Sequence, residues 1–202
     1  MNNSVKLGNI IVVSAPSGAG KSSICEAVLA SNKKNITYSI SYTSRHKRAG
    51  EKNGKNYFFV SEEIFKEMVK EGKFVEWAKV HGNYYGTSKE LLNKSLAVCK
   101  NIILEIDVQG AMNIKKQYPD RTCMIFIMTP DFKTLEKRLM ARNKDRKEII
   151  DIRMINAKKE LKYLPNYDYL VINKKLVDAV ESVKTIIKSL DYKIQKGSIY
   201  FA

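Results

Sequence analysis

The hydrophobic positions of this 202-residue chain follow two alternating patterns. Short apolar runs rich in β-branched residues predict buried strands, and these runs lie at 9–14, 101–107, 122–128 and 168–173. Between them, apolar residues recur every three to four positions and predict helices over 21–31, 109–118 and 175–194. One side of the last helix carries Val180, Val183, Ile187 and Leu190. Strands that alternate with helices in this way favour an α/β fold built on a mainly parallel sheet.

The pattern changes between residues 36 and 86, where short aromatic runs replace the longer apolar ones. Only one helix is predicted there, over 61–72, so this segment is expected to form a small antiparallel sheet inserted into the core. A second insertion is expected at 139–155, where a charged turn interrupts two helices. Because the chain shows no internal repeat, low-complexity tract or Pro/Gly-rich linker, its elements are expected to pack as one unit.

Composition describes an ordinary globular chain, with 44% hydrophobic and 28% charged residues. No apolar stretch reaches the length of a membrane span, and the apolar run near the N-terminus is too short for a signal peptide. The three cysteines, Cys25, Cys99 and Cys123, are widely scattered without paired spacing. They are therefore expected to be reduced thiols in a cytoplasmic protein that does not bind membranes.

The formal net charge of +15 favours an anionic partner without identifying it. Nucleic acid, an acidic membrane surface or small polyphosphates would all be attracted to such a chain. Much of the excess is lysine spread along the whole sequence, which is typical of a solvated surface. A nucleic-acid-binding function would draw on this charge alone, and nucleic acid is not expected as a partner.

The segment "APSGAGKS", residues 15–22, matches a phosphate-binding loop except that Ala15 replaces the first glycine. Glycines such as Gly18 and Gly20 let backbone N–H groups turn inward around phosphates, at the positive end of the following helix. Lys21 can reach the outer phosphates of a nucleoside triphosphate, and the Ser22 hydroxyl suits Mg²⁺. The alternative is an ordinary glycine-rich turn, but a predicted strand before it and a predicted helix after it favour the phosphate loop.

A pair of acids follows the second buried strand. Glu105 and Asp107 lie at its carboxyl end, where parallel sheets bind ligands, and a two-residue period points them to the same face. Either could therefore reach Mg²⁺ or a second substrate beside the phosphate loop. An acid that merely ends a strand is common, so this pattern alone is a weak indication.

A second anionic site is predicted from "SYTSRHKRAG", residues 41–50. Arg45 and Arg48 offer forked donors, and Ser41 adds a hydroxyl suited to a phosphate monoester, as do Thr43 and Ser44. Further along come Tyr57, Glu76, Tyr85 and Thr87. Arginines and tyrosines with one carboxylate suggest a nucleoside monophosphate. A carboxylate suits guanine, which presents adjacent N1–H and 2-amino donors, whereas adenine presents an acceptor at N1.

These motifs resemble the guanylate kinase family over nearly the whole chain. The resemblance rests on "SAPSGAGKS", "YTSRHKRAGEKNGKNYFFV", "FVEWAKVHGNYYGTS", "EIDVQGA", "EKRLMAR" and "YLVIN". It implies a P-loop NTPase-type parallel sheet flanked by helices, with a small strand-rich GMP-binding insertion and a helical lid. The expected segments are a core of 1–36, 89–138 and 156–202, a GMP-binding subdomain of 37–88 and a lid of 139–155.

The family's activity would be Mg²⁺-dependent transfer of the γ-phosphoryl group of ATP to GMP, and to dGMP, in purine nucleotide metabolism. By the resemblance, ATP would be bound by Ser14, Ala15, Pro16, Ser17, Gly18, Ala19, Gly20, Lys21, Ser22, Ser23 and Asn173. GMP would be bound by Ser41, Arg45, Arg48, Tyr57, Glu76, Tyr85, Thr87 and Asp107, of which Glu76, Thr87 and Asp107 would read the guanine. The catalytic residues would be Lys21, Arg45, Arg138, Arg142 and Arg153. Ser22 would contact the metal.

Two positions depart from the commonest family pattern. Glu105 stands where many members have aspartate, and "ARN" replaces the usual Arg-Gly of the lid. The first leaves open whether Glu105 contacts the metal, and the second leaves the lid hinge open while keeping its arginines. Neither a monomer nor a homo-oligomer is favoured by the sequence.

Structural alternatives exist for several of these residues. Thr87 opens "TSKE", a capping box, so it could cap a helix, contact the base, or do both. Arg138 and Arg142 are four apart, a spacing usual on a solvated helix face, and Trp77 is expected in the core of the insertion. For the whole chain, the alternatives are a non-catalytic guanylate-kinase-like interaction module and a different small-molecule kinase. The intact Gly20, Lys21 and Ser22, together with the lid arginines, argue against the module.

Overall fold

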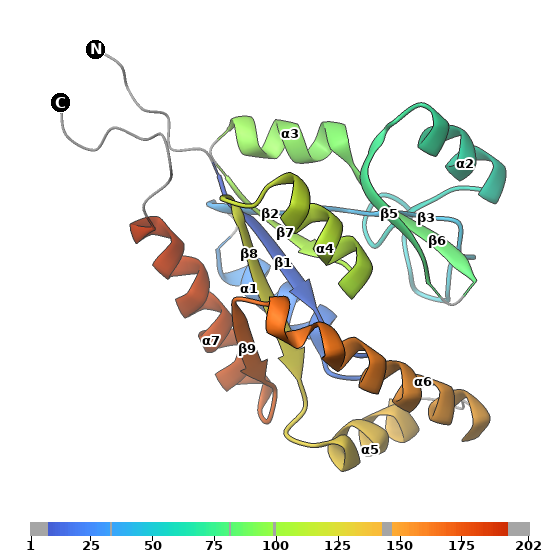
Figure 1. Ribbon diagram of the computed structural model, residues 1–202, viewed down its shortest axis with the longest axis vertical. Helices are drawn as coiled ribbons and strands as arrows, with labels where there is room; N and C mark the ends of the chain where they lie inside the picture. The colour runs from blue at the N-terminus through green and yellow to red at the C-terminus, as the bar shows by residue number, and fades with distance from the viewer. Residues whose placement is uncertain (1–7, 33, 81, 99, 143–146, 194–202) are drawn as a thin grey trace.

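The computed structural model describes residues 8–32, 34–80, 82–98, 100–142 and 147–193 (Figure 1). Its core is a five-stranded parallel sheet in the order β2-β7-β1-β8-β9. The strands are β2 (Ile36–Tyr38), β7 (Asn101–Glu105), β1 (Ile10–Ser14), β8 (Thr122–Met128) and β9 (Tyr169–Ile172). β1 and β8 are buried over their whole length, which explains their continuous apolar sequences.

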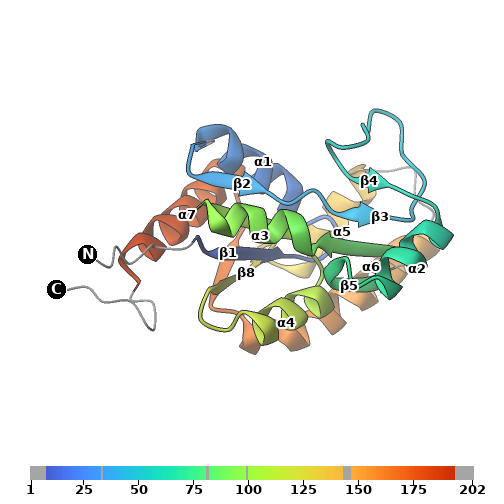
Figure 2. The same cartoon turned by 90° about the horizontal axis from the view of Figure 1, so that it is seen from above.

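Helices cover both faces of this sheet, as Figure 2 shows for α1 and α4. Side chains of a strand alternate between faces, and β1 divides accordingly: Ile11 and Val13 join one apolar cluster, while Ile10 and Val12 join another. The first cluster packs against α1 (Lys21–Ser31), α5 (Phe132–Arg142), α6 (Lys147–Glu160) and α7 (Leu176–Ser189). The second packs against α3 (Lys89–Ala97) and α4 (Val108–Gln117). The expected α/β fold is confirmed.

A second, four-stranded sheet in the order β4-β3-β6-β5 lies beside the core. Its strands are β3 (Tyr42–Thr43), β4 (Phe58–Phe59), β5 (Phe74–Val80) and β6 (Asn83–Ser88). The pairs β3–β6 and β5–β6 are antiparallel, as expected, but β3 and β4 are parallel. The predicted helix, α2 (Glu62–Lys70), covers this sheet by stacking the buried Phe65 on Phe74, with ring centroids 4.6 Å apart.

A register shift in β5 decides how the small sheet meets the core. The pairing register between β5 and β6 shifts by a β-bulge between Phe74 and Glu76. As a result Val75 and Glu76, which are adjacent in sequence, are both buried. Val75 packs into the core cluster on the α4 side, and Glu76 lines a polar cavity described below. A bulge of this kind redirects a side chain that strict alternation would send to the opposite face.

Two expectations for this region are wrong, and one of the alternatives left open for Thr87 is excluded. Residues 36–38 form β2 at the edge of the core sheet, paired with β7, and do not belong to the small sheet. Trp77 is 44% exposed, and its ring is tilted by 53° against the ring of Tyr84, so it is not a core residue. Thr87 does not cap α3, because Ser88 is the N-cap residue and accepts a hydrogen bond from the N–H of Leu91.

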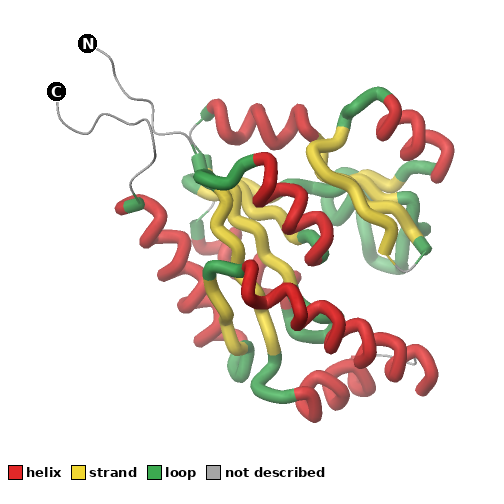
Figure 3. Tube along the Cα trace, viewed as in Figure 1, coloured by secondary structure: helices red, strands yellow, loops and turns green. Residues whose placement is uncertain are grey.

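The helices α5 and α6 project from the same end of the core as the small sheet (Figure 3). They extend over 132–142 and 147–160, beyond the expected lid of 139–155 on both sides, and residues 143–146 lie outside the described part. Leu139 and Ile150 anchor the two helices in the core cluster. The segment limits proposed from the sequence, including the lid, remain predictions.

The remaining elements are two short 3-10 helices, Leu161–Asn166 and Leu190–Tyr192, of which the second extends α7. Cys25 and Cys123 are buried free thiols, as expected, and Cys99 lies outside the described residues. None of the helices that the structure describes is long and apolar enough to span a membrane.

Candidate active site

The phosphate loop connects the end of β1 at Ser14 to the start of α1 at Lys21. Gly18 and Gly20 have φ angles of 89° and 94°, a left-handed conformation that glycine adopts without strain. Gly20 is the N-cap of α1 and provides no side-chain acceptor, so the first N–H groups of the helix are left for another acceptor. This geometry suits an anion at the amino end of α1.

Gly20 is also required by close packing against Asn173. A β-carbon at position 20 would collide with the Asn173 amide, whose Nδ2 donates to the backbone carbonyl of Ala19 at 2.8 Å. Arg138 Nη2 in turn donates to the backbone carbonyl of Asn173 at 2.9 Å. These contacts join α5, the end of β9 and the phosphate loop. Gly20, Asn173 and Arg138 line a cavity of about 350 Å³. The other lining residues are Gly18, Ser23 and Leu176.

The side chains of Lys21 and Ser22, in the first turn of α1, point toward the end of β7. Lys21 Nζ donates to the backbone carbonyl of Ile106 at 3.3 Å, and Ser22 Oγ donates to Glu105 Oε1 at 2.6 Å. Tyr38 of β2 donates its phenol hydrogen to the other carboxylate oxygen, Glu105 Oε2, at 3.0 Å. Burial, followed by the negative charge of Glu105, raises the pKa of Tyr38 well above its ordinary value. The phenol therefore remains a hydrogen-bond donor.

The residues beside the loop fit a magnesium ion that is held largely by phosphate and water. Mg²⁺ prefers oxygen ligands and usually takes only one or two from protein side chains. The Ser22 hydroxyl and the Glu105 carboxylate meet at 2.6 Å and supply such oxygens. Within the part of the chain that the structure describes, no group of three or more His, Cys, Asp or Glu side chains could hold a metal by itself.

Arg45 and Arg48 line a second cavity, of about 310 Å³, which also reaches Ser22 and Glu105. The Arg45 guanidinium lies 5.5 Å from the centre of the Tyr57 ring and donates to Glu51 Oε1 at 2.7 Å. The other Glu51 oxygen accepts from the backbone N–H of Arg48 at 2.8 Å. The hydrogen bond from Arg45 lowers the pKa of Glu51, so an ionised acid orients the Arg45 guanidinium and fixes the backbone at Arg48. Glu51 was not predicted from the sequence.

The neighbouring hydroxyls have different roles from those expected. Thr43 Oγ1 donates to the backbone carbonyl of Tyr84, and Ser44 Oγ accepts from the backbone N–H of Tyr84. These two bonds fasten the arginine loop to β6, and only Ser41 among the three hydroxyl residues lines a cavity of the site.

A third cavity, of about 180 Å³, lies between the small sheet and the ends of the core strands. Its predicted site residues come from four separate stretches of sequence: Lys21, Ser41, Tyr57, Glu76, Tyr85, Glu105 and Asp107. Tyr57, Tyr85 and Glu105 also line the arginine cavity, so the two cavities adjoin. The structure therefore brings the phosphate-loop lysine and the second anionic site to one place.

Glu76 is the buried acid of this cavity, with an exposed fraction of 6%. Thr87 Oγ1 donates to its Oε1 at 2.5 Å. Burial above all, aided by the nearby charge of Asp107, raises the pKa of Glu76 to about 7, although the Thr87 hydrogen bond acts in the opposite direction. A β-carbon at Gly110 would collide with Glu76 Oε2, so a glycine in the first turn of α4 makes room for the acid.

Asp107 and the lid arginines occupy different positions. Asp107 caps α4 by accepting from the backbone N–H of Gly110 at 3.0 Å, and it faces the cavity as well. Arg138 reaches the phosphate loop, as described above. Arg142 ends α5, and its side chain lies outside the described part. Arg153 is half-buried on α6 and is not among the residues lining these three cavities.

Sequence reasoning missed Glu160, the last residue of α6. Its carboxyl lines a cavity with Asp107 and Lys79. Burial raises the pKa of Glu160 to about 7, the charge of Lys21 lowers it, and the charge of Asp107 raises it. The carboxyl at the end of α6 is therefore within electrostatic range of the phosphate-loop lysine. A charged residue at the end of a helix carries no sequence signal for such a position.

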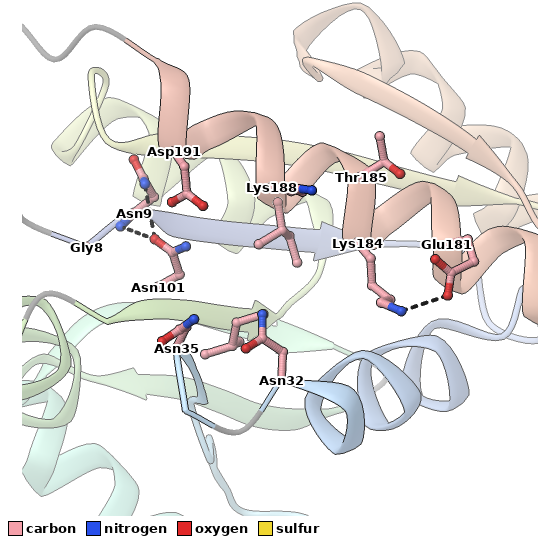
Figure 4. Close-up of a pocket in the computed structure, with 12 residues that line it drawn as sticks. Gly8, Asn9, Asn32, Asn35, Asn101, Glu181, Lys184, Thr185, Lys188 and Asp191 are labelled. Carbon is pink, nitrogen blue, oxygen red and sulfur yellow. Dashed lines mark hydrogen bonds and ion pairs between the residues drawn. The ribbon is translucent and has the colours of Figure 1, made fainter.

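A larger hollow, of about 760 Å³, opens at the opposite end of the core sheet, at the amino ends of its strands (Figure 4). It lies where β1, β2 and β7 begin, and its polar lining includes Asn9 and Asn101, which are hydrogen-bonded to each other at 3.1 Å. Parallel sheets bind ligands at the carboxyl ends of their strands, where the phosphate loop lies. The smaller cavities are therefore the candidate active site.

A phosphate loop, an adjoining arginine pocket and a buried acid between them define a nucleotide-dependent phosphotransferase of the phosphate-loop class. A family model described as guanylate kinase matches residues 7–190. The chain belongs to the guanylate kinase family, as its motifs predicted. It is 44% identical to a guanylate kinase of Wolinella succinogenes over 193 residues, covering 96% of this chain and 88% of the relative.

Two further comparisons agree with this assignment. A guanylate kinase of Caldanaerobacter subterraneus subsp. tengcongensis is 46% identical over 204 residues, covering 96% of this chain and 98% of the relative. The crystal structure of guanylate kinase from Anaplasma phagocytophilum superposes with a TM-score of 0.79 at 29% identity. That match covers 95% of this chain and 92% of the other, so the likeness includes the core sheet and the small sheet together.

Proposed function

We propose that this protein transfers the γ-phosphoryl group of ATP to GMP, forming ADP and GDP, and that it also accepts dGMP. The observation that carries the proposal is the shared cavity, in which Lys21 of the phosphate loop faces Ser41, Tyr57, Glu76 and Tyr85 of the second site. A donor phosphate held by the loop would thus meet an acceptor held by the arginine pocket. ATP and GMP are cytoplasmic metabolites, and the activity implies that location.

The donor nucleotide would occupy the phosphate loop, residues 14–23. Backbone N–H groups and Lys21 would hold its phosphates, and the cavity beside Asn173 and Arg138 would take the adenine side. The Ser22 hydroxyl would hold Mg²⁺, with Glu105 next to it. When bound, the ion supplies positive charge that neutralises the phosphate oxygens.

The acceptor would occupy the two adjoining cavities of the small sheet. Arg45 and Arg48, with hydroxyls of Ser41, Tyr57 and Tyr85, would hold the GMP phosphate. Glu76 would accept the N1–H and 2-amino donors of guanine. Thr87 and Asp107 flank Glu76 and would complete the recognition of the base.

The chemistry requires alignment and positive charge more than proton transfer. The phosphate of GMP is ionised at neutral pH and can attack without a general base. Lys21 and Arg45, which line the two adjoining cavities, would offset the repulsion between two anionic nucleotides. Arg138, with Arg142 and Arg153, would add charge from the lid as it closes, which would also exclude water and limit ATP hydrolysis.

An assay of ADP formation tests this proposal, with GMP, AMP, CMP and UMP supplied in turn at constant ATP and Mg²⁺. We expect rapid ADP formation with GMP, and little with the other three acceptors or with none. GMP-dependent ADP formation would also exclude the non-catalytic interaction module. Equal rates with and without GMP would contradict the proposal, because the enzyme would then be an ATPase.

A further inference from the structure

We propose that Tyr38 is a positioning residue that holds the Glu105 carboxylate against Ser22 of the donor site, an inference that rests on the proposed function. Tyr38 is not expected to touch either reacting phosphate. It acts through Glu105, and its effect should therefore appear in the metal requirement of nucleotide binding.

The geometry around Glu105 carries this inference. Its two oxygens have different partners: Oε1 accepts from Ser22 at 2.6 Å and Oε2 accepts from Tyr38 at 3.0 Å. The carboxylate is thus held between α1, which follows the phosphate loop, and β2, the edge strand of the core sheet. With one oxygen fixed by the phenol, the other remains directed at the loop.

Strand register explains why the phenol reaches this acid. Tyr38 pairs with Ile103 in the parallel β2–β7 ladder, two residues before Glu105. Residues two apart on a strand share a face, so Tyr38 and Glu105 project to the same side of the sheet. The Tyr38 ring packs on the apolar cluster that contains Ile103, which leaves the hydroxyl to extend past the end of the cluster.

A phenol is chemically suited to this task. A glutamate has one more rotatable bond than an aspartate would have at position 105, so a second contact restricts a freer side chain. Tyr38 is neutral and orients the carboxylate without cancelling its charge, whereas a lysine would pair with it. Outer-shell partners of this kind typically change metal affinity or activity by about 10- to 100-fold when they are removed.

A different role for Tyr38 must be separated from this one. Its side chain also lines the cavity that contains Arg45 and Arg48, so the phenol could contact the acceptor phosphate directly. That role would change the KM for GMP and leave metal-dependent binding of the donor nucleotide unaltered. The two roles are therefore distinguished by a binding measurement made without GMP.

The test is equilibrium binding of a fluorescent ADP analogue across a Mg²⁺ series, with no GMP present and hence no turnover. For Tyr38→Phe, the Mg²⁺ concentration that gives half-maximal enhancement of binding should rise about tenfold. Binding in the absence of Mg²⁺ should be unchanged. The matched control is Tyr42→Phe, which removes a phenol from a ring stacked on Phe58 in the small sheet and should leave both quantities as in wild type.

A double-mutant cycle shows whether Tyr38 acts through Glu105. In a Glu105→Ala background, Tyr38→Phe should cause no further change, because the group being positioned is gone. The inference is overturned by an unchanged Mg²⁺ requirement in Tyr38→Phe, by an equal loss in the Glu105→Ala background, or by wild-type ADP binding that does not depend on Mg²⁺. Failure of the proposed function would appear elsewhere, as no GMP-dependent ADP formation by the wild-type protein.

Discussion

Glu76→Gln should sharply reduce the preference for GMP over AMP. A site built to pair with donors of its substrate rejects an analogue lacking them by up to about 10⁴–10⁵, because buried polar groups are left unpaired. Glu76 is such a group, since it is 6% exposed and already has one oxygen occupied by Thr87. An amide has one acceptor and one donor end, so it cannot accept two guanine donors. We expect the ratio of kcat/KM for the two acceptors to fall to about 10² or less.

Steady-state kinetics with GMP and AMP measure this ratio in each protein. Glu71→Gln is the matched control, because the Glu71 side chain is 54% exposed at the surface of the small subdomain. It should behave as wild type. A wild-type protein that phosphorylates both purines equally well would show that Glu76 does not select the base.

The same acid should make GMP binding depend on pH. Burial raises the pKa of Glu76 to about 7, so without GMP the group gains a proton as the pH falls through 7. Two guanine donors need the ionised form, and the KM for GMP should therefore rise by up to about tenfold per pH unit below 7. The GMP phosphate itself titrates near pH 6. The pH dependence of the KM that comes from the phosphate should remain in Glu76→Gln, while the part that comes from Glu76 should be lost.

Arg138→Ala should lower kcat by about 10³ or more with a smaller change in the KM for ATP. Arginines that stabilise the transferring phosphoryl group contribute about 10³–10⁵ to the rate. Arg138 is placed for such a role, because its guanidinium reaches the phosphate loop through Asn173 and lines a cavity with Gly18 and Gly20. Rapid-quench or steady-state measurement of kcat at saturating ATP and GMP gives the effect.

Two further variants identify the cause of that loss. Lys137→Ala removes an exposed cation from the same helix and should leave kcat near the wild-type value. Arg138→Lys retains the charge without the planar fork and should recover only part of the rate. If Arg138→Ala raises the KM for ATP while kcat stays normal, the residue binds the nucleotide and is not catalytic. Thermal unfolding would show whether loss of the Asn173 contact also destabilises the fold.

The core could be predicted from the sequence because its signals are local. The apolar run at 122–128 matches β8 residue for residue, and the helical pattern at 21–31 matches α1 in the same way. A fully buried strand and a helix with one buried side each leave a continuous local pattern. The phosphate loop is equally local, because its glycines and Lys21 are adjacent in the chain. The strand before the loop and the helix after it are also visible in the sequence, so the donor site could be predicted from one continuous segment.

The errors occur where distant contacts decide the structure. β2 is three residues long and belongs to the core only because it pairs with β7, about 65 positions further along the chain. The bulge in β5 buries Val75 and Glu76 together, which no period-two pattern can anticipate. Thr87 does not cap α3 but donates to Glu76, a contact that its neighbours in the sequence do not encode.

In the candidate site, too, local signals could be predicted and contacts between distant residues could not. Ser41, Glu76 and Asp107 could be singled out by residue type and family resemblance, but their convergence on one cavity depends on how the small sheet sits on the core. Glu51, Tyr38 and Glu160 were missed because their importance lies in their neighbours, Arg45, Glu105 and Lys21. None of these pairs has a recognisable spacing in the sequence.

The central claim is that two nucleotides meet phosphate to phosphate between Lys21 and Arg45. A crystal structure with GMP and a non-hydrolysable ATP analogue bound together tests it most directly. The account predicts the GMP phosphate in the arginine pocket, facing the terminal phosphate of the analogue, with guanine against Glu76. An acceptor bound away from that terminal phosphate, or a base turned away from Glu76, would contradict it.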